Sequence, residues 1–168
     1  MRIGDWRVGC AAFFLATGLA WGQQLVLAER LNVTNVWSGC PVGFAMLTHS
    51  NRQFLAFYDA SRAMTLAQRD LSTNVWTFAS LPSTFGWDSH NYVTMALDRD
   101  GFLHVSGNMH CVPLVYFRSA RPLDIRDMQP VHRMTGEREK RVTYPRFMNG
   151  PDGALLFTYR DGGSGNGS

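Results

Sequence analysis

From residue 23 onward, short apolar runs alternate with turn-forming residues along the chain. Three of these runs, FLAFYDA (54–60), FLHVSGN (102–108) and ALLFTYR (154–160), have the length and the aromatic and branched content of strands. Clusters of Gly, Asn, Asp, Ser and Pro separate the runs, and these are the residues that tight turns favour. The pattern therefore predicts an all-β fold.

One segment fits two secondary structures. Residues 61–71, SRAMTLAQRDL, have some helical spacing, but Met64, Leu66 and Gln68 also alternate as they would in a strand. The runs on both sides of this segment resemble strands. No convincing amphipathic helix is found between residue 23 and the last residue.

A weak repeat organises the predicted strands. The turns at residues 51–53, 99–101 and 151–153 recur at intervals of 48 and 52 residues, and an alternating strand follows each turn. A period near 50 in an all-β sequence is typical of the blades of a β-propeller. Two complete units and the start of a third precede Ser168. The sequence therefore predicts the N-terminal part of a longer propeller, truncated at its C-terminus.

The repeat also predicts which polar residues face a common cleft. Arg160 follows its turn glycine at the same distance as Asn108 follows Gly101, so both are expected at equivalent strand exits. Within the 102–110 run, alternation places His104 and His110 on one face, together with Ser106 and Asn108. A bulge at Gly107 would break that count.

The first 22 residues resemble a secretory signal. Arg2 and Arg7 precede a 14-residue apolar run (8–21), and small residues stand at the −3 and −1 positions before Gln23. The run is short for a membrane span. We therefore expect cleavage after residue 22, a propeller region at 23–168, and a secreted or periplasmic protein without a membrane anchor.

The charge balance limits the partners. Loss of Arg2, Arg7 and Asp5 with the signal reduces 16 basic and 13 acidic residues to 14 and 12, a net charge of +2. That charge is too small for a nucleic-acid-binding protein, and no basic stripe is present. It is compatible with an anionic polymer held by a few arginines.

Two cysteines, Cys40 and Cys111, follow the signal. In an exported protein an even pair suggests a disulfide, and two free thiols are the alternative. A zinc site that uses Cys111 with His90, His104 or His110 is a third interpretation, although the spacing matches no compact metal motif.

Polar side chains are most concentrated in residues 86–118. This segment holds His90, Asn91, His104, Asn108 and His110. Burial of so many hydrogen-bonding groups beside aromatic residues has a desolvation cost, so a functional site is a better interpretation than a plain core. For His104, as for His49 and His132 elsewhere, a hydrogen-bonded core position is the preferred interpretation. Trp87, Tyr116 and Phe117 are expected in the core rather than on sugar rings.

Four blocks of sequence resemble the BNR-repeat family of exported β-propeller proteins. These blocks are GWDSHNYV, DGFLHVSGNMHCVPLVYFRS, RVTYPRF and LLFTYRDGGSGNG. Within that family they are most similar to ulvan lyases built as seven-bladed propellers, and the resemblance runs from about residue 43 to the end. It implies a polysaccharide lyase that cleaves an anionic, uronic-acid-containing polysaccharide by β-elimination.

The resemblance implies a catalytic set of His90, His110, Tyr144 and Arg160. A guanidinium suits neutralisation of the uronate carboxylate, because it binds a carboxylate through two hydrogen bonds and keeps its charge. His90 and Tyr144 suit proton transfer, and which of the two is the base stays open. His110 completes the proton-transfer pair or binds the carboxylate. Asn91 and Asn108 are candidate substrate contacts.

Two other classes of function, a binding protein and a glycoside hydrolase, differ from a lyase in the residues that they need. A non-catalytic carbohydrate-binding propeller would use the same cleft without cleaving the sugar. Tyr144 as a packed strand residue and an Arg160–Asp161 salt bridge are the structural alternatives for the site. A glycoside hydrolase needs paired carboxylates, and the acidic residues here stand mostly in turn contexts. The elimination needs no cofactor. A structural metal ion and the oligomeric state stay open.

Overall fold

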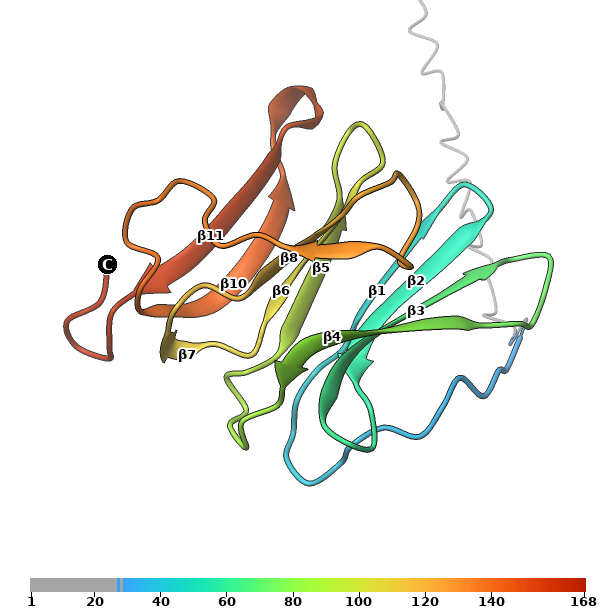
Figure 1. Ribbon diagram of the computed structural model, residues 1–168, viewed down its shortest axis with the longest axis horizontal. Helices are drawn as coiled ribbons and strands as arrows, with labels where there is room; N and C mark the ends of the chain where they lie inside the picture. The colour runs from blue at the N-terminus through green and yellow to red at the C-terminus, as the bar shows by residue number, and fades with distance from the viewer. Residues whose placement is uncertain (1–26, 28) are drawn as a thin grey trace, which may run out of the picture. The chain divides into compact units, whose positions relative to one another are not determined.

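The computed structural model describes residues 27 and 29–168, so the predicted signal peptide at 1–22 lies outside the described residues. The first sheet is an antiparallel meander of four strands in chain order (Figure 1). Its strands are β1 (Ala45–His49), β2 (Arg52–Tyr58), β3 (Ala63–Asp70) and β4 (Thr77–Thr84). The ambiguous segment at 61–71 is thus a strand.

The second sheet repeats this arrangement. It contains β5 (Val93–Leu97), β6 (Leu103–Gly107), β8 (Tyr116–Ser119) and β9 (Met128–Pro130), again in antiparallel order. The third sheet has the order β11-β10-β7, with β10 (Val142–Asn149) in the middle between β11 (Leu155–Asp161) and β7 (His110–Val112). The strand β7 therefore leaves the second unit and pairs with the third.

The repeat predicted from the sequence corresponds to the sheets. Each of the three turn signals joins two neighbouring strands of one sheet, namely β1 to β2, β5 to β6, and β10 to β11. The last of these turns contains a single turn of 3-10 helix, Pro151–Gly153. The prediction of an all-β, propeller-type fold with two blades and the start of a third is confirmed.

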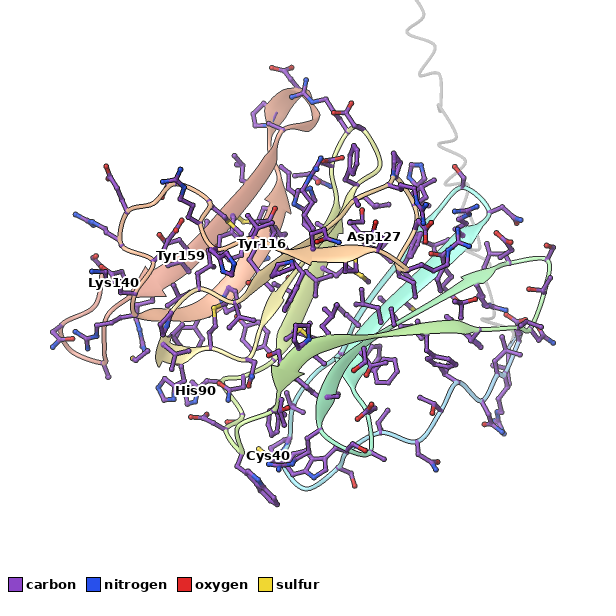
Figure 2. All side chains as sticks on the ribbon, viewed as in Figure 1. Cys40, His90, Tyr116, Asp127, Lys140 and Tyr159 are labelled. Carbon is purple, nitrogen blue, oxygen red and sulfur yellow. The ribbon has the colours of Figure 1, made fainter. Side chains whose placement is uncertain are left out.

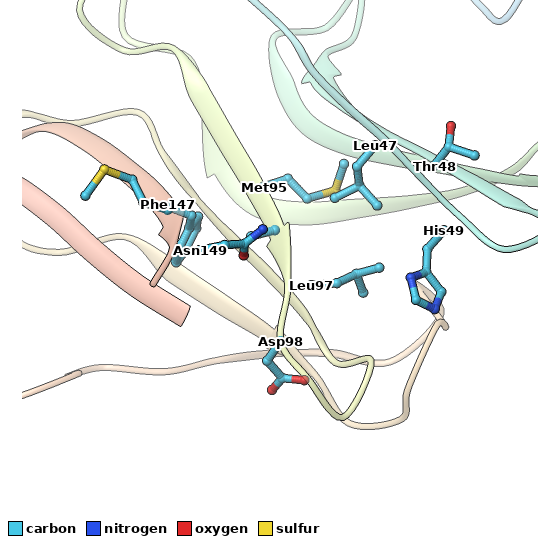
Figure 3. A pocket seen from close by; sticks show the side chains of 10 residues that line it. Leu47, Thr48, His49, Met95, Leu97, Asp98, Phe147 and Asn149 are labelled. Carbon is cyan, nitrogen blue, oxygen red and sulfur yellow. The ribbon is translucent and has the colours of Figure 1, made fainter. Parts of the chain in front are cut away.

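The three sheets lie side by side, and one strand of each, namely β1, β5 and β10, takes part in the contacts between them. Strand β5 contacts both β1 and β10. A cleft of about 370 Å³ opens among these three strands (Figure 3). It is lined by Leu47, Thr48 and His49 of β1, Met95 to Asp98 at β5, and Phe147 to Asn149 of β10.

One hydrophobic core joins the first two sheets. Phe54 and Leu66 of the first sheet and Leu103 and Val105 of the second have no exposed surface and belong to the same cluster of buried side chains. Burial of such side chains contributes about 1.5–3 kcal/mol each, so this cluster fixes how the second unit sits against the first. Among the described residues, no helix has the length and apolar character that a membrane span requires.

Candidate active site

The register of the third sheet brings two predicted site residues together. Thr143, in the central strand β10, pairs with Arg160 of β11 on one side and with His110 of β7 on the other. Directly paired residues of neighbouring strands present their side chains on the same face of the sheet. Arg160 and His110 are 50 residues apart in the sequence, but they flank the buried Thr143.

Two β-bulges turn further side chains toward this place. The register of β10 with β11 shifts after Thr143, and the register of β10 with β7 shifts at Cys111. Tyr144 and Cys111 occupy these irregularities, with φ of 59° and 55°. A bulge re-aims a side chain that regular alternation would send to the opposite face. Tyr144 therefore points toward Arg160 instead of away from it.

Tyr144 contacts two of the other predicted residues. Its ring lies 4.8 Å from the guanidinium carbon of Arg160 and 5.5 Å from the ring of His90. The tyrosine is 42% exposed, so it is not a packed core residue. Arg160 forms no salt bridge with any described carboxylate. Its Nε donates to the Gly162 carbonyl at 3.0 Å, and the predicted alternative of an Arg160–Asp161 pair is absent from the described residues.

The two histidines stack on each other. The ring centroids of His90 and His110 are 4.2 Å apart, at an interplanar angle of 26°. His90 belongs to the loop that leads from β4 to β5, and Figure 2 shows it at the edge of the molecule where these strands end. His110 opens β7. All four residues of the predicted catalytic set thus lie in one continuous group of contacts.

A carboxylate that the sequence prediction left out joins this group. Asp88 Oδ1 lies 2.5 Å from His90 Nδ1, and Asp88 Oδ2 lies 2.5 Å from His110 Nδ1. The backbone amide of His90 also donates to Asp88 Oδ1, at 2.9 Å. These hydrogen bonds, first that of the backbone amide and then those of the two imidazoles, hold the pKa of Asp88 well below its usual range.

The local sequence predicts only one of the two contacts that place Asp88 in the site, the turn with His90. An Asp that accepts a hydrogen bond from the amide two residues later forms a common turn, and the letters D-S-H are compatible with one. The other contact joins Asp88 to His110, which lies 22 residues further along the chain. That contact depends on where β7 leaves the second unit, which alternation along the chain does not show.

The predicted common face of His104 and His110 is wrong. After Gly107 the backbone turns at Asn108, where φ is 59°, and the chain passes from β6 to the third sheet. A Cβ at position 107 would lie 2.6 Å from the Tyr92 carbonyl oxygen, so only glycine allows β6 and the chain before β5 to approach this closely. His104 stays in β6, buried and hydrogen-bonded, as its core interpretation predicted.

Asn91 and Asn108 lie beside the histidines but differ in their hydrogen bonds. Asn108 Oδ1 accepts from the Gly86 amide at 3.2 Å, and its Nδ2 donates to Ser83 Oγ at 2.9 Å and to the Thr84 carbonyl at 2.8 Å. Asn108 therefore ties the end of β4 to the end of β6. Asn91 is 7% exposed, and its amide oxygen has no partner among the described residues.

A cleft of about 330 Å³ is formed here, near the lower end of the range for small-molecule pockets. Its lining comprises Thr84, Gly86, Asp88, Asn91, Asn108, His110 and Val112. The two predicted substrate-contacting asparagines thus share one cleft with Asp88 and His110.

Cys111 contacts the arginine side of the site. Its Sγ accepts from Thr143 Oγ1 at 3.6 Å and from Arg160 Nη2 at 3.8 Å. The Thr143 hydrogen bond, followed by Arg160, lowers the pKa of the thiol. Cys40 and Cys111 are both free. The predicted zinc ligand set of Cys111 with histidines does not come together, whereas the ligand atoms of Asp88, His90 and His110 all lie within 4.8 Å of one another.

Backbone strain is concentrated around this site. Nine non-glycine residues of the described part have positive φ, and four of them lie at the site: Trp87, Asn108, Cys111 and Tyr144. Such conformations cost about 1–3 kcal/mol each and persist where the surrounding structure enforces them, often at functional sites. The strain is an independent reason to regard this group as functional.

The sequence also predicted burial of several other aromatic and histidine side chains, and only some of them are buried. Tyr116 and Phe117 are buried, as predicted, but Trp87 is 66% exposed and does not belong to the core. Its ring meets Trp37 edge-on at 4.9 Å, and the guanidinium of Arg62 lies 5.4 Å away. His49 and His132 are exposed, so the prediction of core positions for them is wrong. His49 is the last residue of β1, and His132 lies in the loop that follows β9.

A family model places the chain among known proteins. The model described as "BNR repeat-containing family member" matches residues 52–168, which include every residue of the site. The chain belongs to this family. No curated protein matches the sequence.

Solved structures of polysaccharide lyases share the fold of this family member. The crystal structure of the polysaccharide lyase Uly1 superposes with a TM-score of 0.66 at 19% identity, over 87% of this chain and 41% of that chain. A polysaccharide lyase named PL25-Ulvanlyase gives 0.62 at 16% identity, over 77% and 35%. The latter bound to -[GlcA(1-4)Rha3S]- gives 0.60 at 16% identity, over 77% and 35%. The chain thus spans about two fifths of these structures or less.

Proposed function

We propose that the protein is a polysaccharide lyase that cleaves an anionic, uronic-acid-containing polysaccharide of the ulvan type by β-elimination. One observation carries the proposal. The guanidinium of Arg160, which has no carboxylate partner among the described residues, lies 4.8 Å from the ring of Tyr144, and Tyr144 lies 5.5 Å from the ring of His90. A fixed cation, a phenol and an imidazole thus follow one another along an open surface.

Each group matches one requirement of the reaction. The proton at C5 of a uronate becomes acidic only when the adjacent carboxylate is neutralised, and Arg160 supplies that charge. A base then removes the C5 proton, the C4–O bond breaks, and a C4=C5 double bond forms. An acid delivers a proton to the departing glycosidic oxygen. His90 and Tyr144 divide these two proton transfers between them.

The geometry favours Tyr144 as the group that removes the proton from C5, the carbon that carries the carboxylate. C5 carries the carboxylate carbon directly, so the group that contacts Arg160 is the one nearest to C5 once the carboxylate is bound. Tyr144 makes that contact, and His90 lies on the other side of Tyr144. His110, stacked on His90, supports the imidazole side of the pair.

The names of the structural neighbours support the substrate class. One is a polysaccharide lyase, another is an ulvan lyase, and the latter is also known with an oligosaccharide that contains GlcA. At 16–19% identity these neighbours indicate a shared fold, so the substrate rests on the site residues themselves.

The test is to incubate the complete protein, as its gene encodes it, with ulvan and to record the ultraviolet absorbance of the unsaturated uronate. We expect the chromophore to appear without added cofactor. Binding without the chromophore, across several uronate polysaccharides, would support the non-catalytic binding propeller instead. Absence of both binding and cleavage would contradict both functions.

A further inference from the structure

Among the described residues, Asp88 is the one carboxylate that contacts both histidines of the site. Its two oxygens lie 2.5 Å from the two Nδ1 atoms, one oxygen for each ring. Each imidazole is thus hydrogen-bonded to an ionised carboxylate, and such charge-assisted hydrogen bonds are stronger than those between neutral groups. Its side chain is 31% exposed, against 37% for His90 and 39% for His110, so the three groups line the same open surface.

An ionised carboxylate can only accept hydrogen bonds, so it dictates where each ring carries its proton. Both Nδ1 atoms must donate to Asp88. In each neutral imidazole the lone pair then resides on Nε2, on the far side of the ring from Asp88. The two rings are stacked, with their centroids 4.2 Å apart.

The backbone holds Asp88 in this place. Its Oδ1 accepts from the His90 amide at 2.9 Å, and its own carbonyl accepts from the Asn91 amide at 2.9 Å. The turn therefore fixes the carboxylate relative to His90 by contacts that do not involve His110. Trp87, with φ of 55°, redirects the chain immediately before it.

We propose that Asp88 is a positioning residue that holds both His90 and His110 in the Nδ1–H tautomer and so presents their two Nε2 atoms to the substrate. This inference rests on the proposed lyase function for its kinetic consequence. The tautomers themselves are a property of the resting protein and are measured without substrate.

The first experiment is nitrogen-15 NMR of the histidine rings in the complete protein without substrate. We expect the neutral rings of His90 and His110 to be protonated at Nδ1. Protonation at Nε2 in either ring would overturn the proposal, whatever the activity. So would a stoichiometric metal ion whose removal shifts the nitrogen signals of both rings, because Asp88 and the histidines would then be its ligands.

The second experiment is Asp88→Asn. An amide has one acceptor oxygen and one donor nitrogen, so it can hold one ring as Nδ1–H and must drive the other to Nε2–H. We expect one of the two rings to change tautomer. The turnover number kcat should fall about 100-fold or more with KM changed by a factor of about 3 or less, as expected when a general base is held in the wrong tautomer.

Asp98→Asn is the matched control. Asp98 also hydrogen-bonds a histidine, His104, at 3.0 Å, but this pair lies outside the site. Its substitution should leave the tautomers of His90 and His110 and the value of kcat unchanged. If Asp88→Asn kept both Nδ1–H tautomers and the wild-type kcat in a folded protein, Asp88 would have no positioning role. If the tautomers changed in a protein with no lyase activity in any form, the lyase function would fail and the positioning of the rings would stand.

Discussion

The molecule contains two clusters that are both built from Asp, His and Tyr. They differ in burial, in hydrogen bonding and in backbone geometry. In one, Asp98 Oδ2 lies 3.0 Å from His104 Nε2, and His104 Nδ1 lies 2.7 Å from the Tyr116 hydroxyl. In the other, Asp88 contacts His90 and His110, and His90 contacts Tyr144. We call these the inner cluster (Asp98, His104, Tyr116) and the outer cluster (Asp88, His90, His110, Tyr144).

Burial separates the two clusters. His104 and Tyr116 are each 9% exposed, whereas Tyr144 is 42% exposed. Figure 2 shows Tyr116 among the strands and His90 at the edge of the molecule. In the inner cluster every imidazole nitrogen has a protein partner, so nothing is left to bind a ligand. In the outer cluster each imidazole uses Nδ1 for Asp88 and presents Nε2 to the open surface.

Backbone geometry separates them as well. No member of the inner cluster has positive φ, and His104 and Tyr116 belong to regular strands. The outer cluster has Tyr144 at a bulge and Trp87 and Cys111 next to its members, all with positive φ. Residue types alone therefore do not mark a site. A site is marked instead by polar side chains with unused hydrogen-bonding atoms and by strained backbone, because both cost the fold free energy.

The two clusters should differ most in how they respond to replacement of their tyrosine by phenylalanine. Tyr144→Phe removes a proton-transfer group, so we expect lyase activity to fall about 10²- to 10⁴-fold with little change in polysaccharide binding. Tyr116→Phe leaves His104 Nδ1 unpaired in the core and should cost about 1–3 kcal/mol of stability while activity is retained. Initial rates of unsaturated uronate formation and urea unfolding measure the two effects. Near-normal rates for Tyr144→Phe would refute the mechanism.

Substitution of Arg160 beside the outer cluster and of Arg118 beside the inner cluster provides the second comparison. Arg160→Ala should reduce turnover about 10²- to 10³-fold, because the uronate carboxylate loses its neutralising charge. Arg160→Lys keeps the charge but not the two parallel hydrogen bonds, so it should give an intermediate rate.

Arg118→Lys is the control for that substitution. Arg118 pairs with Asp98 at 3.4 Å and lies 3.8 Å from the Phe102 ring, so it belongs to the surroundings of the inner cluster. Its replacement should leave kcat and KM within about twofold of wild type, since its partners Asp98 and Phe102 lie outside the site. Equal losses in the two lysine variants would mean that the effect of Arg160 is general and not specific to the site.

Gly107 lies between His104 of the inner cluster and His110 of the outer cluster, at the point where β6 ends and the chain leaves for β7. Gly107→Ala would place a Cβ 2.6 Å from the Tyr92 carbonyl oxygen and 2.8 Å from Val93 Cα, both backbone atoms that cannot move aside freely. We expect a loss of about 1–3 kcal/mol in the free energy of unfolding. Gly43→Ala, where nothing lies within 4 Å of the added Cβ, should be nearly neutral. Equal stability of the two variants would show that the close approach at Gly107 is not required.

Sequence reasoning predicted the strands and turns because these depend on local patterns. The hairpins at 51–53, 99–101 and 151–153 follow from turn residues and from the alternation after them, whereas the pattern at Ala63–Asp70 fitted a helix as well as a strand. The resemblance to a family supplied His90, His110 and Tyr144 of the outer cluster but not Asp88, and the structure brings all four together.

The remainder of the site depends on pairing between distant strands. The bulges at Cys111 and Tyr144 exist only relative to the strands beside them, and counting along one strand wrongly joined His104 to His110. Asp88 was missed for the same reason, since half of its role is a contact across 22 residues. Alternation describes one strand at a time, whereas register and bulges are properties of pairs.

The smallest expected effect is the pH dependence that the inner cluster confers on stability. Burial raises the pKa of Asp98, but hydrogen bonds from His104 and from the Phe102 and Asp100 amides outweigh it, so the folded pKa lies below the usual value. A carboxyl with a lowered folded pKa stabilises the fold above its unfolded pKa, about 3.9, and that stabilisation is lost as pH falls through the lower folded value.

Urea unfolding of wild type and Asp98→Asn across this acidic range measures the contribution. The wild type should lose stability relative to the variant as the pH falls below about 4, and the gap should be constant between pH 5 and 7. Asp98 accepts from two backbone amides of the β5–β6 turn, at 3.0 Å and 2.9 Å, so its ionised form supports the hairpin itself. A gap that does not change with pH would mean that Asp98 acts by shape alone. The inner cluster would then stabilise the fold without any charge, and the contrast with the outer cluster would be greater still.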